Sequence, residues 1–88
     1  MEFTKLHTID EITDAIVAAV GLPMSPLKAK RERAARLADL YEMRARLFAD
    51  AAKAAGDQIP VLFVHAANMA AGRDMDQMRF FRREAGAR

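Results

Sequence analysis

The chain has 88 residues, of which 14 are Lys or Arg and 12 are Asp or Glu, and it contains no cysteine. A chain of this length supports only one small hydrophobic core. Without cysteine there is no disulfide scaffold and no thiolate metal site. The two histidines, His7 and His65, are too few and too far apart to predict a metal cluster. The formal net charge of +2 by itself neither favours nor excludes nucleic acid as a partner.

The sequence shows no pattern of a membrane or secreted protein. Its longest uncharged stretch, residues 15–27, is interrupted by Gly21, Pro23 and Pro26, so we do not expect it to cross a membrane. The first residues lack the basic region and apolar run of a signal peptide. We therefore expect a soluble, cytoplasmic protein.

Residues 9–20 are predicted to form the first helix. Thr8 is a suitable N-cap, and Glu11 lies three residues later, as a reciprocal capping box requires. Gly21 is expected to end the helix in the left-handed conformation. The apolar positions at helical spacing are Ile9, Ile12, Ile16, Ala19 and Val20. Asp10, Glu11 and Asp14 lie on the opposite face.

Residues 26–55 are predicted to form the second and longest helix. Ser25 is the expected N-cap, Pro26 suits the first helical position, and Gly56 is the expected stop. Its apolar stripe comprises Leu37, Leu40, Tyr41, Leu47, Phe48, Ala51 and Ala55. Asp39, Glu42, Arg46, Asp50 and Lys53 lie opposite, where Glu42–Arg46 and Asp50–Lys53 are expected to pair at the surface.

Residues 60–85 are predicted to form the third helix, with Pro60 in its first turn. Gly72 leaves two alternatives. It is either an interior glycine within a continuous or kinked helix, or the end of one helix, with Asp74 capping another. We expect the continuous or kinked helix.

This third helix is apolar on two roughly opposite sides, as a helix is when it is central in its domain or binds a partner. Either helix 9–20 covers the second stripe, or that stripe is an intermolecular surface that includes Leu62, Met69 and Phe80. We favour the intermolecular surface. The first stripe comprises Phe63, Val64, Ala67, Ala71, Met75, Met78 and Phe81. The second comprises Leu62, Ala66, Met69 and Phe80.

A short turn at residues 56–59 predicts that the two long helices form an antiparallel hairpin. Pairing outward from the turn brings residues near position 44 opposite those near 71. Arg44 lies within an apolar stripe, where an unpaired buried charge costs several kcal/mol. We expect an internal Arg44–Asp74 pair that sets the register. Alternatively, Arg44 binds a carboxylate or phosphate of a partner.

The same hairpin gathers basic side chains at one end. Lys30, Arg33 and Arg82 lie in line with the apolar stripes, so the helices are expected to repel there unless an anion intervenes. Three sources can relieve this repulsion. They are screening by solvent and by the acids of helix 9–20, an acidic protein surface, or nucleic-acid phosphate. The basic residues are Lys28, Lys30, Arg31, Arg33, Arg36, Arg79, Arg82, Arg83 and Arg88, against Glu32 and Glu84. The candidate anion- or nucleic-acid-binding residues are Lys30, Arg33, Arg36, Arg79, Arg82 and Arg83.

Base recognition and catalysis find little support in the sequence. A break at Gly72 would resemble a helix-turn-helix turn, but Arg73 and Asp74 occupy turn positions where apolar residues would pack better. There is no zinc-ligand spacing and no Gly-rich phosphate loop. No histidine or carboxylate set has a spacing that implies acid–base catalysis. We expect no catalytic residue, metal, cofactor or small-molecule substrate.

The sequence as a whole predicts an all-α domain over residues 1–88, a long antiparallel hairpin with a short N-terminal helix packed along it. The expected function is binding, as a small non-enzymatic adaptor, regulator or inhibitor. The expected partner is another protein, bound through the second stripe of the last helix, Arg44 and the basic end. A homodimer is also expected to be possible. The alternative is a nucleic-acid-binding helical protein that uses the basic end.

Overall fold

The computed structural model describes residues 8–55 and 61–86, and within these ranges the chain forms three helices and no strand. The helices are α1 (Ile9–Val20), α2 (Leu27–Ala55) and α3 (Val61–Glu84). The all-α prediction is therefore confirmed. The predicted turn at 56–59, together with Pro60, His7 and Arg88, lies outside the described residues.

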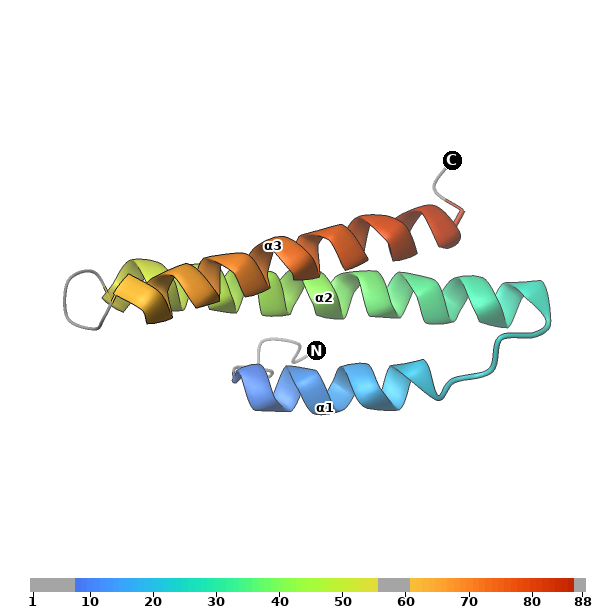
Figure 1. Ribbon diagram of the computed structural model, residues 1–88. Coiled ribbons are helices and arrows are strands. Elements are labelled where there is room, and N and C mark those ends of the chain that lie inside the picture. Colours follow the sequence, from blue (N-terminus) through green and yellow to red (C-terminus); the bar gives the residue numbers. More distant parts are fainter. Residues whose placement is uncertain (1–7, 56–60, 87–88) are drawn as a thin grey trace.

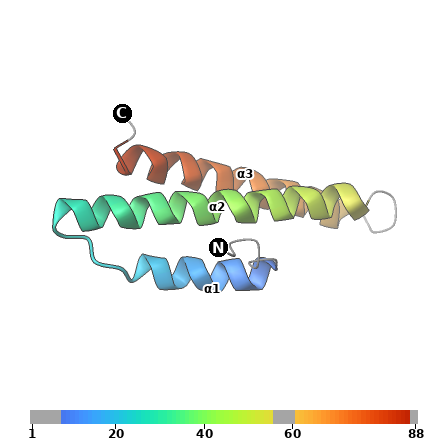
Figure 2. The same cartoon turned by 180° about the vertical axis from the view of Figure 1, so that it is seen from behind.

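The two long helices lie side by side as an antiparallel hairpin, and α1 runs along the middle part of α2, so that both ends of α2 extend beyond it (Figure 1). The view from behind shows the same order, with α1 and α3 on different sides of α2 (Figure 2). The backbone of α1 packs against α2 and not against α3. Because α1 has 12 residues and α2 has 29, the turn end of the hairpin extends well beyond α1.

Helix α1 begins as its sequence predicts and ends differently. The backbone N–H of Glu11 donates to Thr8 Oγ1 at 3.0 Å, and the N–H of Thr8 donates to Glu11 Oε1 at 3.2 Å, which confirms the capping box. Gly21 is not left-handed: its φ of −80° and ψ of −1° are right-handed. The helix instead closes with short-range bonds, as the Leu22 N–H donates to Ala19 O at 3.0 Å.

Helix α2 begins at Leu27, one residue later than expected. The N–H of Lys30 donates to the carbonyl of Pro26 at 3.1 Å. Pro26 therefore occupies the capping position that the sequence assigned to Ser25, and it is not the first helical residue.

The residues at which α2 and α3 pack against each other form the hairpin seam. They recur at alternating steps of three and four residues, as in an antiparallel coiled coil. On α2 the seam comprises Ala34, Ala38, Tyr41, Ala45, Phe48 and Ala52, and all four alanines are buried. On α3 it comprises Val64, Ala67, Ala71, Asp74, Met78 and Phe81. The rings of Tyr41 and Phe81 stack across the seam, with centroids 5.9 Å apart. Small side chains on α2 let the two backbones approach closely.

The main core forms where α1 covers α2. Its buried members are Ile12, Ile16, Ala19, Leu37 and Leu40. Three apolar residues predicted to pack are instead exposed in the structure: Val20, Ala51 and Phe63. Val20 is in the last turn of α1. Ala51 and Phe63 lie near the turn of the hairpin, beyond the reach of α1.

Arg44 joins all three helices. Its Nε donates to Asp74 Oδ2 at 2.8 Å, and its Nη2 donates to Asp74 Oδ1 at 2.9 Å. Its Nη1 donates to Thr13 Oγ1 on α1 at 2.9 Å. Asp74 is only 4% exposed, so this bidentate pair satisfies a carboxylate that burial would otherwise destabilise. The predicted internal pair is confirmed, and each guanidinium nitrogen of Arg44 already donates within the chain.

The hydrogen bonds to Asp74 raise the pKa of Arg44, and the charge of Asp74 acts in the same direction, whereas burial opposes both. A raised pKa means that the folded state holds this proton more tightly than the unfolded chain. The stabilisation from the pair is therefore fully present at neutral pH, and at the alkaline end it is lost as the pH rises through the raised arginine pKa.

Helix α3 passes through Gly72 without a break. This outcome overturns the alternative in which Asp74 caps a separate helix, and with it the helix-turn-helix arrangement. Within the continuous helix Asp74 faces α2 and accepts both hydrogen bonds from Arg44.

Replacing Asp74 with Ala is predicted to destabilise the fold by about 3 kcal/mol, because Arg44 is left largely buried without its partner. Urea unfolding followed by circular dichroism measures this free energy. The control is the double variant Arg44→Met/Asp74→Leu, which removes both charges and is expected to recover most of the loss. A cost below about 1 kcal/mol for Asp74→Ala would show that the pair does not hold the hairpin together.

Replacing Gly72 with Ala is predicted to stabilise the fold by about 0.5–1 kcal/mol, because alanine favours the helix and glycine does not. A Cβ built at Gly72 has nothing within 4 Å, so the added methyl group meets no obstacle. The rise of the thermal midpoint measures the gain. A lower midpoint would indicate that the helix bends at this residue in solution.

Candidate functional site

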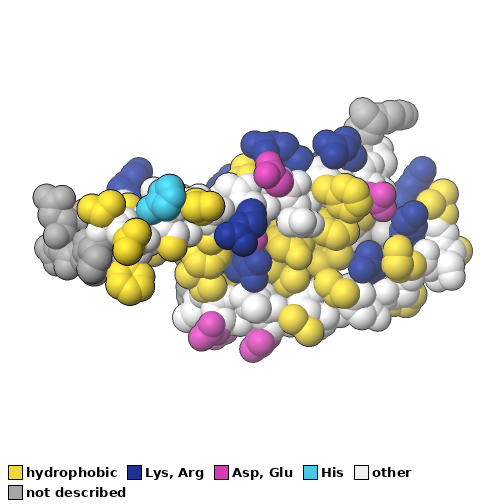
Figure 3. Space-filling model, viewed as in Figure 1, with side chains coloured by type: hydrophobic (Ala, Val, Ile, Leu, Met, Phe, Trp, Pro, Cys, Tyr) yellow, Lys and Arg dark blue, Asp and Glu magenta, His cyan; other side chains and the backbone are white. Residues whose placement is uncertain are grey.

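Large hydrophobic side chains are exposed on the first half of α3. Val61, Leu62, Phe63 and Met69 are exposed by 80%, 78%, 64% and 51%, and we call these four residues the tip patch. The alternative in which α1 covers the second stripe of this helix is wrong, because α1 packs on α2 alone. Figure 3 shows hydrophobic side chains at this end of the hairpin, beyond the end of α1.

Phe80 belongs to the same stripe but lies apart from the tip patch. Eleven residues, or about 16 Å of helix, separate it from Met69, and Arg73 and Asp76 lie between them. Phe80 is 46% exposed and meets Phe81 edge to face, with ring centroids 5.0 Å apart. The structure therefore brings Leu62 and Met69 together and leaves Phe80 at the basic end.

The tip patch is uncharged as well as apolar. Residues 61–72 contain no Asp, Glu, Lys or Arg. Their only titratable side chain is His65, which is exposed. A surface of this kind has no charge to orient a polar ligand, and its chemistry suits an apolar protein surface.

Acids of the chain itself neutralise the basic end. Arg82 on α3 contacts Glu42 Oε1 at 2.8 Å and Asp39 Oδ1 at 3.4 Å, both on α2. Lys30 lies 3.9 Å from Glu84 Oε1. The expectation that the helices repel here without an external anion is therefore wrong. The sequence predicts a solvated face for Asp39 and Glu42, and only the packing of α3 shows that Arg82 reaches them.

Arg33 has a different internal partner. Its Nε donates to the carbonyl of Val20 at 3.2 Å. This carbonyl belongs to the last turn of α1, where backbone oxygens lack helical partners and the helix dipole is negative. Arg33 thus fastens the end of α1 to α2, a role that the sequence pattern did not indicate.

The remaining candidate basic residues differ in whether they form an ion pair within the chain. Arg79 pairs with Asp76 at 3.0 Å on the surface of α3. Arg36 and Arg83 have no ion pair among the described residues. The predicted Glu42–Arg46 pair forms at 2.7 Å, whereas Asp50 and Lys53 do not pair within the described chain.

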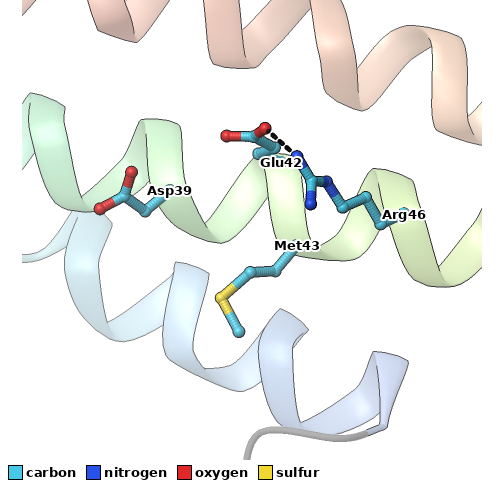
Figure 4. A pocket seen from close by; sticks show the side chains of 4 residues that line it. All are labelled: Asp39, Glu42, Met43 and Arg46. Carbon is cyan, nitrogen blue, oxygen red and sulfur yellow. Dashed lines mark hydrogen bonds and ion pairs between the residues drawn. The ribbon is translucent and has the colours of Figure 1, made fainter. Parts of the chain in front are cut away.

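A shallow cleft of about 210 Å³ lies next to these ion pairs, lined by Asp39, Glu42, Met43 and Arg46 (Figure 4). The side chain of Met43 points from α2 toward α1, and Glu42 lies on the side of α3 and bonds to Arg46. Glu42 also accepts from Arg82, so its carboxylate already has two cationic partners. The cleft is therefore a neutralised surface depression rather than a reactive site.

Among the described residues, no group of three or more His, Asp or Glu side chains is arranged to hold a metal ion. None of the described helices combines the length and apolar character needed to span a membrane. Comparisons with protein-family models, curated proteins and solved structures find no match to this chain.

Replacing Arg82 with Ala is predicted to destabilise the fold by about 0.5–1 kcal/mol, because exposed ion pairs contribute little individually and this one joins two helices. The loss should shrink in high salt, which screens exposed charges. Thermal unfolding at low and high salt measures both effects. A loss that is equal at both salt concentrations would assign Arg82 a packing role through its aliphatic stem.

Proposed function

We propose that this protein is a small non-enzymatic binding protein, an adaptor, regulator or inhibitor that attaches to another protein through the tip patch of α3. The exposure of the tip patch is the observation that carries this proposal. Val61, Leu62, Phe63 and Met69 are large apolar residues on an uncharged stretch of helix that no described element covers.

The free energy that burial of the tip patch supplies is of the size expected for reversible binding. Full burial of one large apolar side chain contributes about 2 kcal/mol, so the four residues of the tip patch contribute about 8 kcal/mol before costs. Association costs are of the same order, about 4–15 kcal/mol. The patch alone therefore supports a weak complex, and a tight one needs further contacts such as Phe80.

The basic end is suited to orienting an acidic protein surface. Arg36 and Arg83 have no ion pair within the described chain, and neither do Lys28 and Arg31 of the same basic end. Charges of this kind speed encounter with an oppositely charged partner more than they add affinity. The internal pairs of Lys30, Arg33 and Arg82 reduce the number of cations free for phosphate, which weakens the nucleic-acid alternative.

Met69→Asp and Leu62→Asp are predicted to weaken partner binding at least tenfold, because each places a charge in an apolar contact. The partner is first captured from a nuclease-treated extract of the native host and identified by mass spectrometry. Its affinity for each purified variant is then measured by calorimetry. Asn68→Asp is the matched control, since it adds the same charge at an exposed polar position next to Met69.

Two results would contradict this proposal. Equal affinities for Met69→Asp and Asn68→Asp would place the interface elsewhere. Binding that is lost on nuclease treatment and abolished by Arg36→Ala/Arg83→Ala, with a steep dependence on salt, would show that the ligand is nucleic acid.

A further inference from the structure

A second group of exposed hydrophobic side chains lies at the end of the molecule opposite the tip patch. Each is between 43% and 67% exposed, and no residue from 15 to 27 is charged. In Figure 1 the linker between α1 and α2 passes round this end of the elongated molecule, far from the turn of the hairpin. The group comprises Val17 and Val20 in the last turn of α1, Leu22 and Met24 in the linker, and Leu27 at the start of α2, and we call it the linker patch.

Unlike the tip patch, the linker patch is adjacent to cations without a partner in the described chain. Lys28 and Arg31 are exposed in the first two turns of α2, Arg83 is exposed in the last turn of α3, and none of them forms an ion pair there. The two helix ends lie together, since Lys30 of α2 is 3.9 Å from Glu84 of α3. Figure 3 shows Lys and Arg side chains beside hydrophobic ones at this end of the molecule.

The stability of the isolated chain does not account for Lys28 and Arg31. The N-terminal end of a helix carries a partial positive charge, and cations in the first turns of α2 oppose it. The first turn of α2 contains no acid that would offset them. Glu32 is exposed and has no ion pair in the described chain, but it is one negative charge against Lys28, Arg31 and Arg83. An external anion beside the linker would relieve this repulsion.

Protruding apolar side chains beside cations match the surface of an anionic lipid bilayer. Such a surface accepts apolar side chains without a complementary shape, and its negative headgroups attract Lys and Arg. A protein partner would instead need an acidic, concave surface that fits a helix end and a linker together. The tip patch lies in a stretch, residues 61–72, that has no cation, and it therefore lacks this chemistry.

We propose that the linker patch attaches this protein to the surface of a bilayer that contains anionic lipid. Leu22 and Met24 enter the apolar layer beneath the headgroups, whereas Lys28, Arg31 and Arg83 contact the headgroups themselves. The chain lies on the bilayer and does not cross it. Because the molecule is 49 Å long, a bilayer at the linker patch leaves the tip patch accessible to a protein partner at the other end. The attachment is therefore independent of the function proposed above.

Flotation of the full chain with lipid vesicles tests this proposal. We expect binding to vesicles of phosphatidylcholine mixed with phosphatidylglycerol, and much weaker binding to phosphatidylcholine alone. Met24→Asp is expected to weaken the binding at least tenfold, because a carboxylate is repelled by the headgroups and is costly to bury. Met69→Asp is the matched control, since Met24 and Met69 are 53% and 51% exposed and the same charge is added at the opposite end. Circular dichroism verifies that both variants keep their helices.

The contribution of the cations is measured with the same vesicles. Lys28→Gln/Arg31→Gln is expected to weaken binding about 25-fold, because each cation near an anionic surface strengthens binding about fivefold. Lys53→Gln/Arg73→Gln is the control, since it removes the same charge from two exposed residues that are nearer the turn and have no ion pair in the described chain. Equal losses in the two double variants would overturn a specific role for the linker end.

The absence of native cysteine allows insertion to be observed directly. An environment-sensitive fluorophore attached at Met24→Cys is expected to shift to the blue with anionic vesicles, and one attached at Met69→Cys is not.

Absence of binding to anionic vesicles overturns the proposal, as do equal losses in Met24→Asp and Met69→Asp. A chain that ignores vesicles but loses its captured protein partner in Met24→Asp would show that the linker patch is a protein interface. Failure of the proposed function gives a different result: Met69→Asp would then leave partner binding unchanged, while the effect of Met24→Asp on vesicle binding would remain.

Discussion

The bidentate contact between Arg44 and Asp74, extended by Thr13, is the constraint on which the rest of this structure depends. A buried aspartate and a largely buried arginine exist in the hairpin only when they face each other, so they permit one register of α2 against α3. That register brings Arg82 to Glu42 and Lys30 to Glu84. The bond to Thr13 positions α1 on the same framework.

Charge neutralisation follows from this register and changes how the basic end is interpreted. The sequence gathers nine basic residues there, which suggests a binding site for an external polyanion. The fold uses Lys30, Arg33 and Arg82 to fasten its own helices, and each is paired with an acid or with a backbone carbonyl. What remains among the described residues is a smaller positive surface, formed by Lys28, Arg31, Arg36 and Arg83.

The unequal lengths of the helices explain where apolar surface remains. Helix α1 seals Leu37 and Leu40 but ends far short of the turn, so Phe63 and Met69 have no third helix above them. The exposed apolar side chains of the tip patch are the surface that the proposed partner covers.

Local signals in the sequence were sufficient for much of this fold. The capping box at Thr8, the bounds of the helices to within one residue and the Arg44–Asp74 pair were predicted correctly, because they depend on short spacings and on the cost of an unpaired buried charge. The sequence did not predict the right-handed conformation of Gly21 or the partners of Arg33 and Arg82. Nor did it predict the exposure of Phe63 and Ala51. These features depend on how far one helix extends along another and on which side chains it reaches, distances that only the packed helices determine.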